Sequence, residues 1–181
     1  MNNLSVIVSS TRPQRIGGQV ADWVRQGVGA EWDTTLIDLA ALDLPFLNED
    51  LPAGSGVYTL PHTLAWKAMV DASDAIVIVN AEYNGLFTAP LKNAIDYLRA
   101  EWADKPIAIV GYGWGGAGRA NTALTQLLNN LKANVIGEMG LFFNTDLTLE
   151  GDLTVTEAKA DELRALSAKL AEAQTAVPEA A

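Results

Sequence analysis

The chain has 181 residues, of which 49% are hydrophobic, so it can bury the core of one compact domain. It contains no cysteine and one histidine, which excludes disulfides, thiolate nucleophiles and histidine-cluster metal sites, so we expect no metal site. Its formal net charge of −10 argues against a nucleic-acid partner and against binding to an anionic membrane. No apolar stretch approaches the ~20 residues that span a bilayer, and the first residues lack the features of a signal peptide, so we expect a cytoplasmic protein.

Short apolar runs alternate with longer amphipathic runs, which is the pattern of parallel strands joined by crossover helices. The apolar runs predict strands at residues 4–9, 34–39, 75–80, 106–111 and 134–143. The amphipathic runs predict helices at residues 16–29, 61–73, 88–102, 119–133 and 156–173. We expect the last strand to be bent near Gly137 and Gly140, and the segment 48–58 to be a flexible connection. Residues 1–175 should form a single domain, followed by a flexible tail at 176–181.

This alternation of strands and helices predicts an α/β fold, namely a doubly wound five-stranded parallel sheet with helices on both faces. We favour the strand order 2-1-3-4-5. In that order the carboxyl ends of strands one and three flank the switch point, and strand four lies alongside them. A ligand should therefore meet the loops that follow Ser9, Asn80 and Val110.

The loop after strand one, residues 9–18, carries three hydroxyls and two arginines and leads into the start of a helix. Guanidinium groups and the free N–H groups of a helix start both bind phosphate oxygens. We therefore predict a phosphate site in this loop, formed by its hydroxyls, by Arg12 and Arg15, and by the backbone at the helix start, Ile16 and Gly17. The loop lacks the G-x-x-x-x-G-K-[ST] motif, which argues against a nucleoside triphosphatase. A solvated capping loop is the alternative interpretation.

The loop after strand three contains Glu82, Tyr83, Asn84 and Gly85. An Asn-Gly pair accommodates positive φ angles, which turn backbone amides toward the edge of a ligand. We predict that a flat heterocycle lies against this turn. An ordinary strand-to-helix turn is the alternative.

The loop after strand four, residues 111–119, matches G-x-G-x-x-G by letter. A dinucleotide fingerprint normally follows strand one, so its position after strand four argues against that interpretation. We predict instead a low wall that lets the backbone approach a ring edge. Its candidate residues are Gly111, Gly113, Gly115 and Gly116, with Tyr112 or Trp114 lining the site. A glycine-rich loop whose aromatic side chains pack on neighbouring surface is the alternative.

These three loops, in this order and at this spacing, resemble the NAD(P)H-dependent FMN reductase family of flavodoxin-like proteins over residues 6–143. The most specific part is Glu82-Tyr83-Asn84-Gly85 followed by Leu91-Lys92-Asn93-Ala94-Ile95-Asp96. The resemblance implies a flavodoxin-like fold in which Ser10, Arg12 and Arg15 hold the FMN phosphate. It also implies that residues 82–85 contact the isoalloxazine ring and that residues 111–118 close its pyrimidine side.

The resemblance implies an activity and an assembly as well. Hydride would pass from NADPH or NADH to bound FMN, and the electrons would then reach a small acceptor such as a flavin or a quinone. A homodimer or homotetramer is implied, with the helix at 88–102 in the interface and a second subunit bordering the flavin. The chain departs from the commonest family pattern at Ser9, where glycine is frequent, at Ala81, where proline is frequent, and at Ile16-Gly17, where a polar pair is often seen.

No catalytic side chain is predicted, because no triad or metal cluster can be assembled and FMN would carry the chemistry. His62 lies beside Pro61 at a predicted helix start, where a capping or surface role is favoured. Two alternatives remain: a flavodoxin-type electron carrier that does not oxidise NAD(P)H directly, and a non-catalytic binding module of the same fold. Arg12 and Arg15 favour the reductase, because flavodoxin phosphate loops are usually rich in Ser, Thr and Gly.

Overall fold

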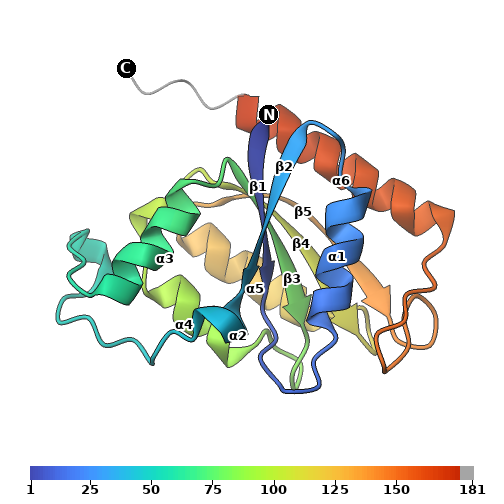
Figure 1. Ribbon diagram of the computed structural model, residues 1–181, viewed down its shortest axis with the longest axis horizontal. Helices are drawn as coiled ribbons and strands as arrows, with labels where there is room; N and C mark the ends of the chain where they lie inside the picture. Colours follow the sequence, from blue (N-terminus) through green and yellow to red (C-terminus); the bar gives the residue numbers. More distant parts are fainter. Residues whose placement is uncertain (176–181) are drawn as a thin grey trace.

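A central sheet lies between two layers of helices in the computed structural model, which describes residues 1–175 (Figure 1). The strands are β1 (Asn2–Val8), β2 (Trp32–Asp38), β3 (Ala75–Ala81), β4 (Pro106–Gly113) and β5 (Asn134–Phe142). The α-helices are α1 (Gly17–Gly27), α2 (Leu39–Leu42), α3 (Pro61–Asp71), α4 (Ala89–Asp96), α5 (Gly118–Asn130) and α6 (Glu157–Thr175). Two short 3-10 helices, η1 (Ala53–Ser55) and η2 (Ala100–Trp102), complete the list. The predicted tail at 176–181 lies outside the described residues.

All neighbouring strands are parallel, and their order is β2-β1-β3-β4-β5, which confirms the predicted topology. Every residue of β3 and β4 is buried, because helices cover both faces of these central strands. This double coverage explains why both strands appear in the sequence as continuous apolar runs. The carboxyl ends of β1, β3 and β4 lie side by side, so the three candidate loops leave the sheet at the same edge.

The two layers of helices bury separate cores. One core joins α1 and α6 to the sheet through side chains such as Val24 and Leu166. The other joins α3, α4 and α5 to the opposite face through Trp66, Leu91 and Leu124. None of the helices in residues 1–175 is long and apolar enough to cross a membrane. The cytoplasmic location stays a prediction.

The helix predicted over 88–102 was too long. The structure ends α4 at Asp96 and places the separate turn η2 after it. Two buried indoles explain the early end, since the N–H of Trp66 donates to the carbonyl of Ala94 (2.8 Å) and the N–H of Trp102 donates to that of Ile95 (3.1 Å). The Trp66 donor satisfies the carbonyl of Ala94, and the carbonyl of Ile95 accepts the backbone N–H of Leu98 (3.2 Å) as well as the indole, so the chain can leave the helix there.

Other predicted boundaries shift by a few residues. The helix predicted to end at residue 133 stops at Asn130, because Lys132 adopts a left-handed conformation with a φ of 63°. The short helix α2 was not predicted, and it begins where the carboxylate of Asp38 accepts the N–H of Ala40 (3.0 Å). Strand β5 is not broken, but its register with β4 shifts between Val135 and Gly137, opposite Ile107 and residue 108, so the irregularity lies beside Gly137 as expected.

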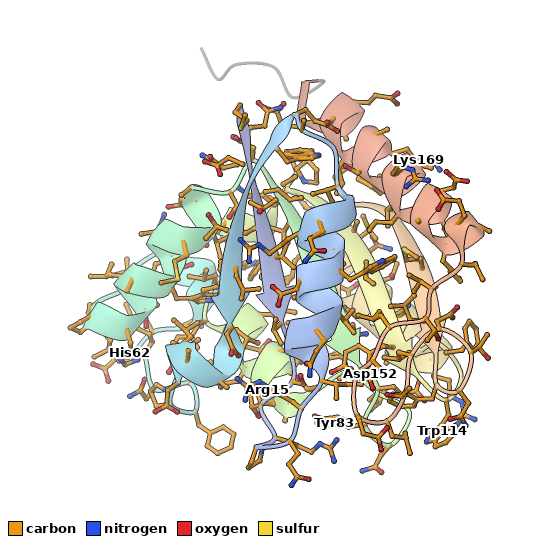
Figure 2. The ribbon with its side chains drawn as sticks, turned by 45° about the vertical axis from the view of Figure 1, so that its right-hand side comes forward. Arg15, His62, Tyr83, Trp114, Asp152 and Lys169 are labelled. Atoms are coloured by element: carbon orange, nitrogen blue, oxygen red, sulfur yellow. The ribbon has the colours of Figure 1, made fainter. Side chains whose placement is uncertain are left out.

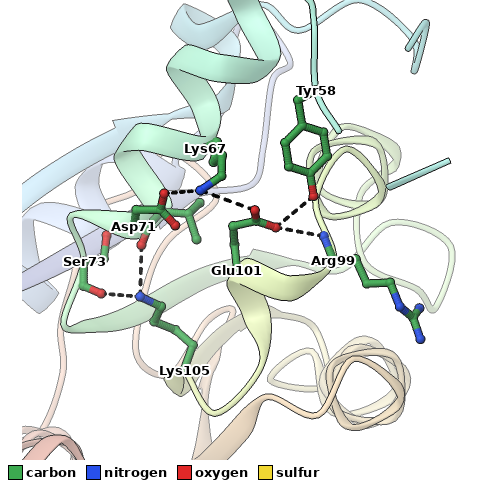
Figure 3. A network of polar contacts seen from close by, with 8 residues as sticks. Tyr58, Lys67, Asp71, Ser73, Arg99, Glu101 and Lys105 are labelled. Atoms are coloured by element: carbon green, nitrogen blue, oxygen red, sulfur yellow. Dashed lines mark hydrogen bonds and ion pairs between the residues drawn. The ribbon is translucent and has the colours of Figure 1, made fainter. Parts of the chain in front are cut away.

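The connection between α2 and α3, expected to be flexible over 48–58, has several anchors in the structure. The side chain of Asn93 on α4 bonds the backbone of residues 45 and 47, and the carboxylate of Glu49 accepts the N–H groups of residues 59 and 60. Farther along, the hydroxyl of Tyr58 donates to Glu101 (2.9 Å), which also lies 3.5 Å from the ammonium of Lys67 (Figure 3). This polar network ties the connection to both α3 and η2.

Candidate functional site

A pocket of about 560 Å³ opens where the carboxyl ends of β1, β3 and β4 meet. Figure 2 shows Arg15, Tyr83 and Trp114 along this end of the molecule, with His62 well away from them. Most of its lining comes from the three predicted loops. The lining residues are Arg12, Arg15, Ile16, Ala81, Glu82, Tyr83, Asn84, Tyr112, Gly113, Trp114, Phe143 and Leu149.

The hydroxyl of Ser10 is buried near the phenol of Tyr112 and forms no well-aligned hydrogen bond among residues 1–175. It faces the start of α1, where a Cβ added to Gly17 would lie only 2.4 Å from this hydroxyl and 2.9 Å from a methyl of Val8. Glycine is therefore required at this position for the helix to approach the loop. No side chain caps the start of α1 after Ile16, so its first N–H groups are available together with the Ser10 hydroxyl.

The two arginines of this loop differ in their partners. Arg15 forms an ion pair with Asp38 (2.5 Å), and both side chains are only 26% exposed. Arg12 has no carboxylate partner in the described chain, and its guanidinium carbon lies 5.5 Å from the centroid of the Tyr83 ring. Sequence pattern alone does not distinguish the two arginines. Arg12 is the guanidinium free to bind an anion, whereas the charge of Arg15 is already largely balanced by Asp38.

The turn after β3 has the predicted geometry. Asn84 and Gly85 have φ angles of 53° and 82°, and the backbones of Tyr83 and Leu86 bond each other in both directions (2.8 and 3.1 Å). The turn is therefore rigid and presents Tyr83 and Asn84 to the pocket. Gly85 is not among the lining residues, because it lies on the outer side of the turn, against the side chain of Arg119.

Glu82 is the only carboxylate among the residues that line the pocket. Its carboxylate accepts the backbone N–H of Ala120 in the first turn of α5 (3.4 Å). A helix start favours a negative charge, so this contact fixes the orientation of the Glu82 side chain. The loop after β3 is in this way joined to the helix that follows the glycine-rich loop.

The glycine-rich loop contributes less to the pocket than predicted. Gly113 lines it, but Gly111, Gly115 and Gly116 are absent from the lining. Gly111 lies inside β4, where an added Cβ would be 2.5 Å from the amide oxygen of Asn121, and Gly116 packs in the same way against the ring of Phe142. These two glycines allow close packing beneath the site rather than contact with a ligand.

Two lining residues, Phe143 and Leu149, were missed from the sequence. Both follow β5, which lies beside β4, so the strand order 2-1-3-4-5 was the signal that could have placed this segment near the site. Tyr112 had been named as a candidate lining residue, and the structure buries it at the end of β4. Burial raises the pKa of Tyr112 to about 12, so its phenol is neutral over the physiological range.

The pocket offers an anion site at one end and a flat, partly aromatic cleft at the other. It holds no pair of a nucleophile and a base, since its ionisable lining is limited to Arg12, Arg15, Glu82 and two tyrosines. His62 lies elsewhere, bonded to Asn48. Such a site is suited to binding a phosphorylated planar cofactor rather than to acid–base catalysis by side chains.

Comparison with known proteins agrees with this chemistry. The model of the NADPH-dependent FMN reductase family matches residues 2–148. The chain belongs to this family. The resemblance derived from the three loops is thereby confirmed, and so is its enzyme interpretation: the family uses FMN and a nicotinamide cosubstrate.

Curated relatives give the same result. An NAD(P)H-dependent FMN reductase of Schizosaccharomyces pombe is 37% identical over 140 residues, which cover 74% of this chain and 69% of the relative. An NAD(P)H-dependent FMN reductase of Saccharomyces cerevisiae is 33% identical over 147 residues, covering 74% and 77%. A quinone reductase of Pseudomonas putida is 32% identical over 136 residues, covering 70% and 69%.

Among solved structures, a flavoenzyme NAD(P)H:(acceptor) oxidoreductase from Paracoccus denitrificans superposes with a TM-score of 0.73. The likeness covers 97% of this chain and 98% of that protein at 23% identity. At this identity the likeness shows the fold alone, and the fold is the flavodoxin-like one predicted from the sequence.

Proposed function

We propose that the pocket binds FMN and that the chain transfers hydride from NAD(P)H to FMN and then electrons to a quinone-type acceptor. The observation that carries this proposal is the buried Ser10 hydroxyl, which has no well-aligned hydrogen bond among residues 1–175 and lies beside the uncapped start of α1. A buried polar group normally has a partner, and a phosphate monoester would accept bonds from both the hydroxyl and the helix N–H groups. The residues present therefore fit FMN.

Each end of the pocket has a distinct part in this assignment. The Ser10 hydroxyl, the Arg12 guanidinium and the backbone of residues 16 and 17 would hold the phosphate. The turn at Tyr83 and Asn84 and the backbone of Gly113 would hold the ring. Arg15 takes a positioning part, because its ion pair with Asp38 and its weak bond to the carbonyl of Arg12 (3.5 Å) brace the loop.

The chemistry that FMN supplies when bound is the acceptance of a hydride and the later release of electrons. The chain's own residues bind and orient. Backbone donors of the second and third loops would stabilise negative charge that develops at the ring edge. Tyr112 keeps its proton, because burial holds its pKa at about 12, so it serves as part of the wall and not as a base.

Relatives support a quinone-type acceptor. A potato relative, 36% identical over 132 residues, is an NAD(P)H:quinone oxidoreductase, and the Pseudomonas putida relative is a quinone reductase. The partly aromatic lining of the pocket is compatible with such planar acceptors.

We also propose that the chain forms a homodimer or homotetramer through the surface around α4. Phe46 is 86% exposed and Leu47 is about half exposed, and the side chain of Asn93 on α4 fixes the backbone of this segment. Fixed, exposed apolar side chains are typical of interfaces. Light scattering of the purified protein should give the mass of two or four chains, and the mass of a monomer would contradict this proposal.

Anaerobic reduction tests the proposed activity. The protein is loaded with FMN and mixed with NADPH or NADH alone, and flavin absorbance is followed. We expect rapid bleaching by at least one nicotinamide, followed by recovery of absorbance when a quinone is added. Bleaching that needs a separate reductase would instead support an electron carrier, and protein that stays colourless after FMN is added would support a non-catalytic module.

A further inference from the structure

Trp114 is an unusual residue for a protein surface. It is 67% exposed, whereas Trp32, Trp66 and Trp102 are buried and Trp23 is half-buried, so it is the one exposed tryptophan in residues 1–175. It lines the pocket, and Figure 2 shows it at the outer edge of the end that carries Tyr83. A large apolar ring left in water at the mouth of a site is available to pack against a ligand.

The ring of Trp114 is held in place. It meets the ring of Phe143 edge to face, with centroids 5.4 Å apart and an interplanar angle of 67°. The carbonyl of Gly113 accepts the N–H of Phe143 (3.1 Å) and the N–H of Gly116 (3.2 Å), so the loop is bonded both to the end of β5 and to itself. A preorganised aromatic face binds a flat partner at little entropic cost.

Trp114 belongs to an outer wall that we define as Trp114, Phe143 and Leu149. These side chains come from the loops after β4 and β5, and Leu149 is itself about half exposed. Arg12 and Arg15, the positively charged lining residues, come from the loop after β1, whereas Glu82 lies beside Gly113. The pocket is therefore divided into a polar end suited to a phosphate and an apolar outer wall with no charged group of its own.

We propose that Trp114 is a specificity-determining residue that stacks against planar aromatic acceptors, such as naphthoquinones, and that the outer wall is their binding subsite. This proposal rests on the proposed function and deepens it by naming the class of acceptor. The ring of Trp114 supplies stacking area, Phe143 sets its orientation, and Leu149 covers the edge of the acceptor. A compact hydrated anion such as ferricyanide gains nothing from this wall.

The test uses the FMN-loaded protein, its Trp114→Ala and Trp114→Phe variants, and Leu64→Ala as a control that removes another half-exposed side chain, on α3. Equilibrium dialysis with oxidised 1,4-naphthoquinone, without any nicotinamide, measures binding directly. Trp114→Ala should weaken this binding about threefold to tenfold, the range for one aromatic pair. Trp114→Phe should retain most of it, and Leu64→Ala should match the parent protein.

Kinetics and FMN binding complete the test. In Trp114→Ala, the KM for naphthoquinone should rise relative to the KM for ferricyanide by the factor by which naphthoquinone binding weakens in dialysis. The dissociation constant of FMN should stay within about twofold of the parent value. Unchanged naphthoquinone binding would overturn the proposal. So would an equal loss of FMN, which would place Trp114 on the cofactor, or a change in the mass of the assembly, which would place it in an interface. Failure of nicotinamide to bleach the parent protein would refute the proposed function, whereas the dialysis result tests Trp114 in either case.

Discussion

The two arginines of the loop after β1 can be distinguished by mutation. Both line the pocket, but Arg15 is paired with Asp38, whereas Arg12 lies over the Tyr83 ring and has no carboxylate partner among residues 1–175. Arg12→Ala should remove the guanidinium that is free to bind a phosphate. Arg15→Ala removes one whose charge is already balanced, and it leaves the Asp38 carboxylate facing the loop.

The expected magnitude follows from the type of bond. A hydrogen bond to a charged group contributes about 1.5–3 kcal/mol, so Arg12→Ala should weaken FMN binding about 10-fold to 150-fold. Arg15→Ala should weaken it less, since its guanidinium cannot bind a phosphate fully while it remains bonded to Asp38. An ion pair of this partial exposure stabilises a fold by only about 0–1 kcal/mol, so both variants should remain folded.

Flavin fluorescence provides the assay, because binding is measured by titrating each variant with FMN and, in parallel, with riboflavin. Riboflavin has the same ring but no phosphate, so Arg12→Ala should leave its affinity within about twofold of that of the parent protein. Two results would refute this reasoning. One is an equal loss of affinity for riboflavin, and the other is a larger loss of FMN affinity in Arg15→Ala than in Arg12→Ala.

Two further predictions concern stability. Gly17→Ala should destabilise the fold by about 1–3 kcal/mol in urea unfolding, because its Cβ would lie 2.4 Å from the Ser10 hydroxyl, whereas Gly18→Ala, with nothing within 4 Å, should be neutral or stabilising. Burial raises the pKa of Tyr112 from 10.0 to about 12. Between these two pH values the unfolded chain releases a proton that the folded chain keeps, so the free energy of unfolding falls as pH rises. Tyr112→Phe should make that fall shallower in unfolding measured from pH 8 to 11.

The sheet and the positions of the loops could be predicted because they depend on local pattern. Strands covered on both faces appear as apolar runs, and the order of a doubly wound sheet fixes which strand ends meet. The turn at Asn84 and Gly85 was equally predictable, since this pair favours the φ angles that the turn adopts.

The remaining features depend on contacts between residues far apart in the sequence. The end of α4 is set by Trp66 of α3, whose indole N–H donates to the carbonyl of Ala94. The pairing of Arg15 with Asp38 spans 23 positions, and no spacing rule indicates it. The outer wall includes Phe143 and Leu149 only because β5 ends beside β4. Packing between elements, and not local preference, decided these details.

Ser9 and Ala81, where the resemblance led us to expect glycine and proline, are bonded to each other. Both are buried, and the N–H of Ala81 donates to the Ser9 hydroxyl (3.1 Å). Proline at position 81 would have no N–H and would need no such acceptor. The serine hydroxyl thus accepts a donor that proline at position 81 would lack, and this bond secures the start of the turn at Tyr83 and Asn84.

This pairing predicts non-additive effects on stability. Ser9→Ala should cost about 1–3 kcal/mol, because it leaves the Ala81 N–H buried without a partner, and Ala81→Pro alone should also destabilise by leaving the serine hydroxyl unpaired. The double variant Ser9→Ala with Ala81→Pro removes both the donor and the acceptor, so it should be more stable than the sum of the single effects by about 1 kcal/mol or more. Urea unfolding of the protein without FMN measures all four forms, which separates this term from cofactor binding. Strict additivity would show that the bond between Ser9 and Ala81 does not secure the turn.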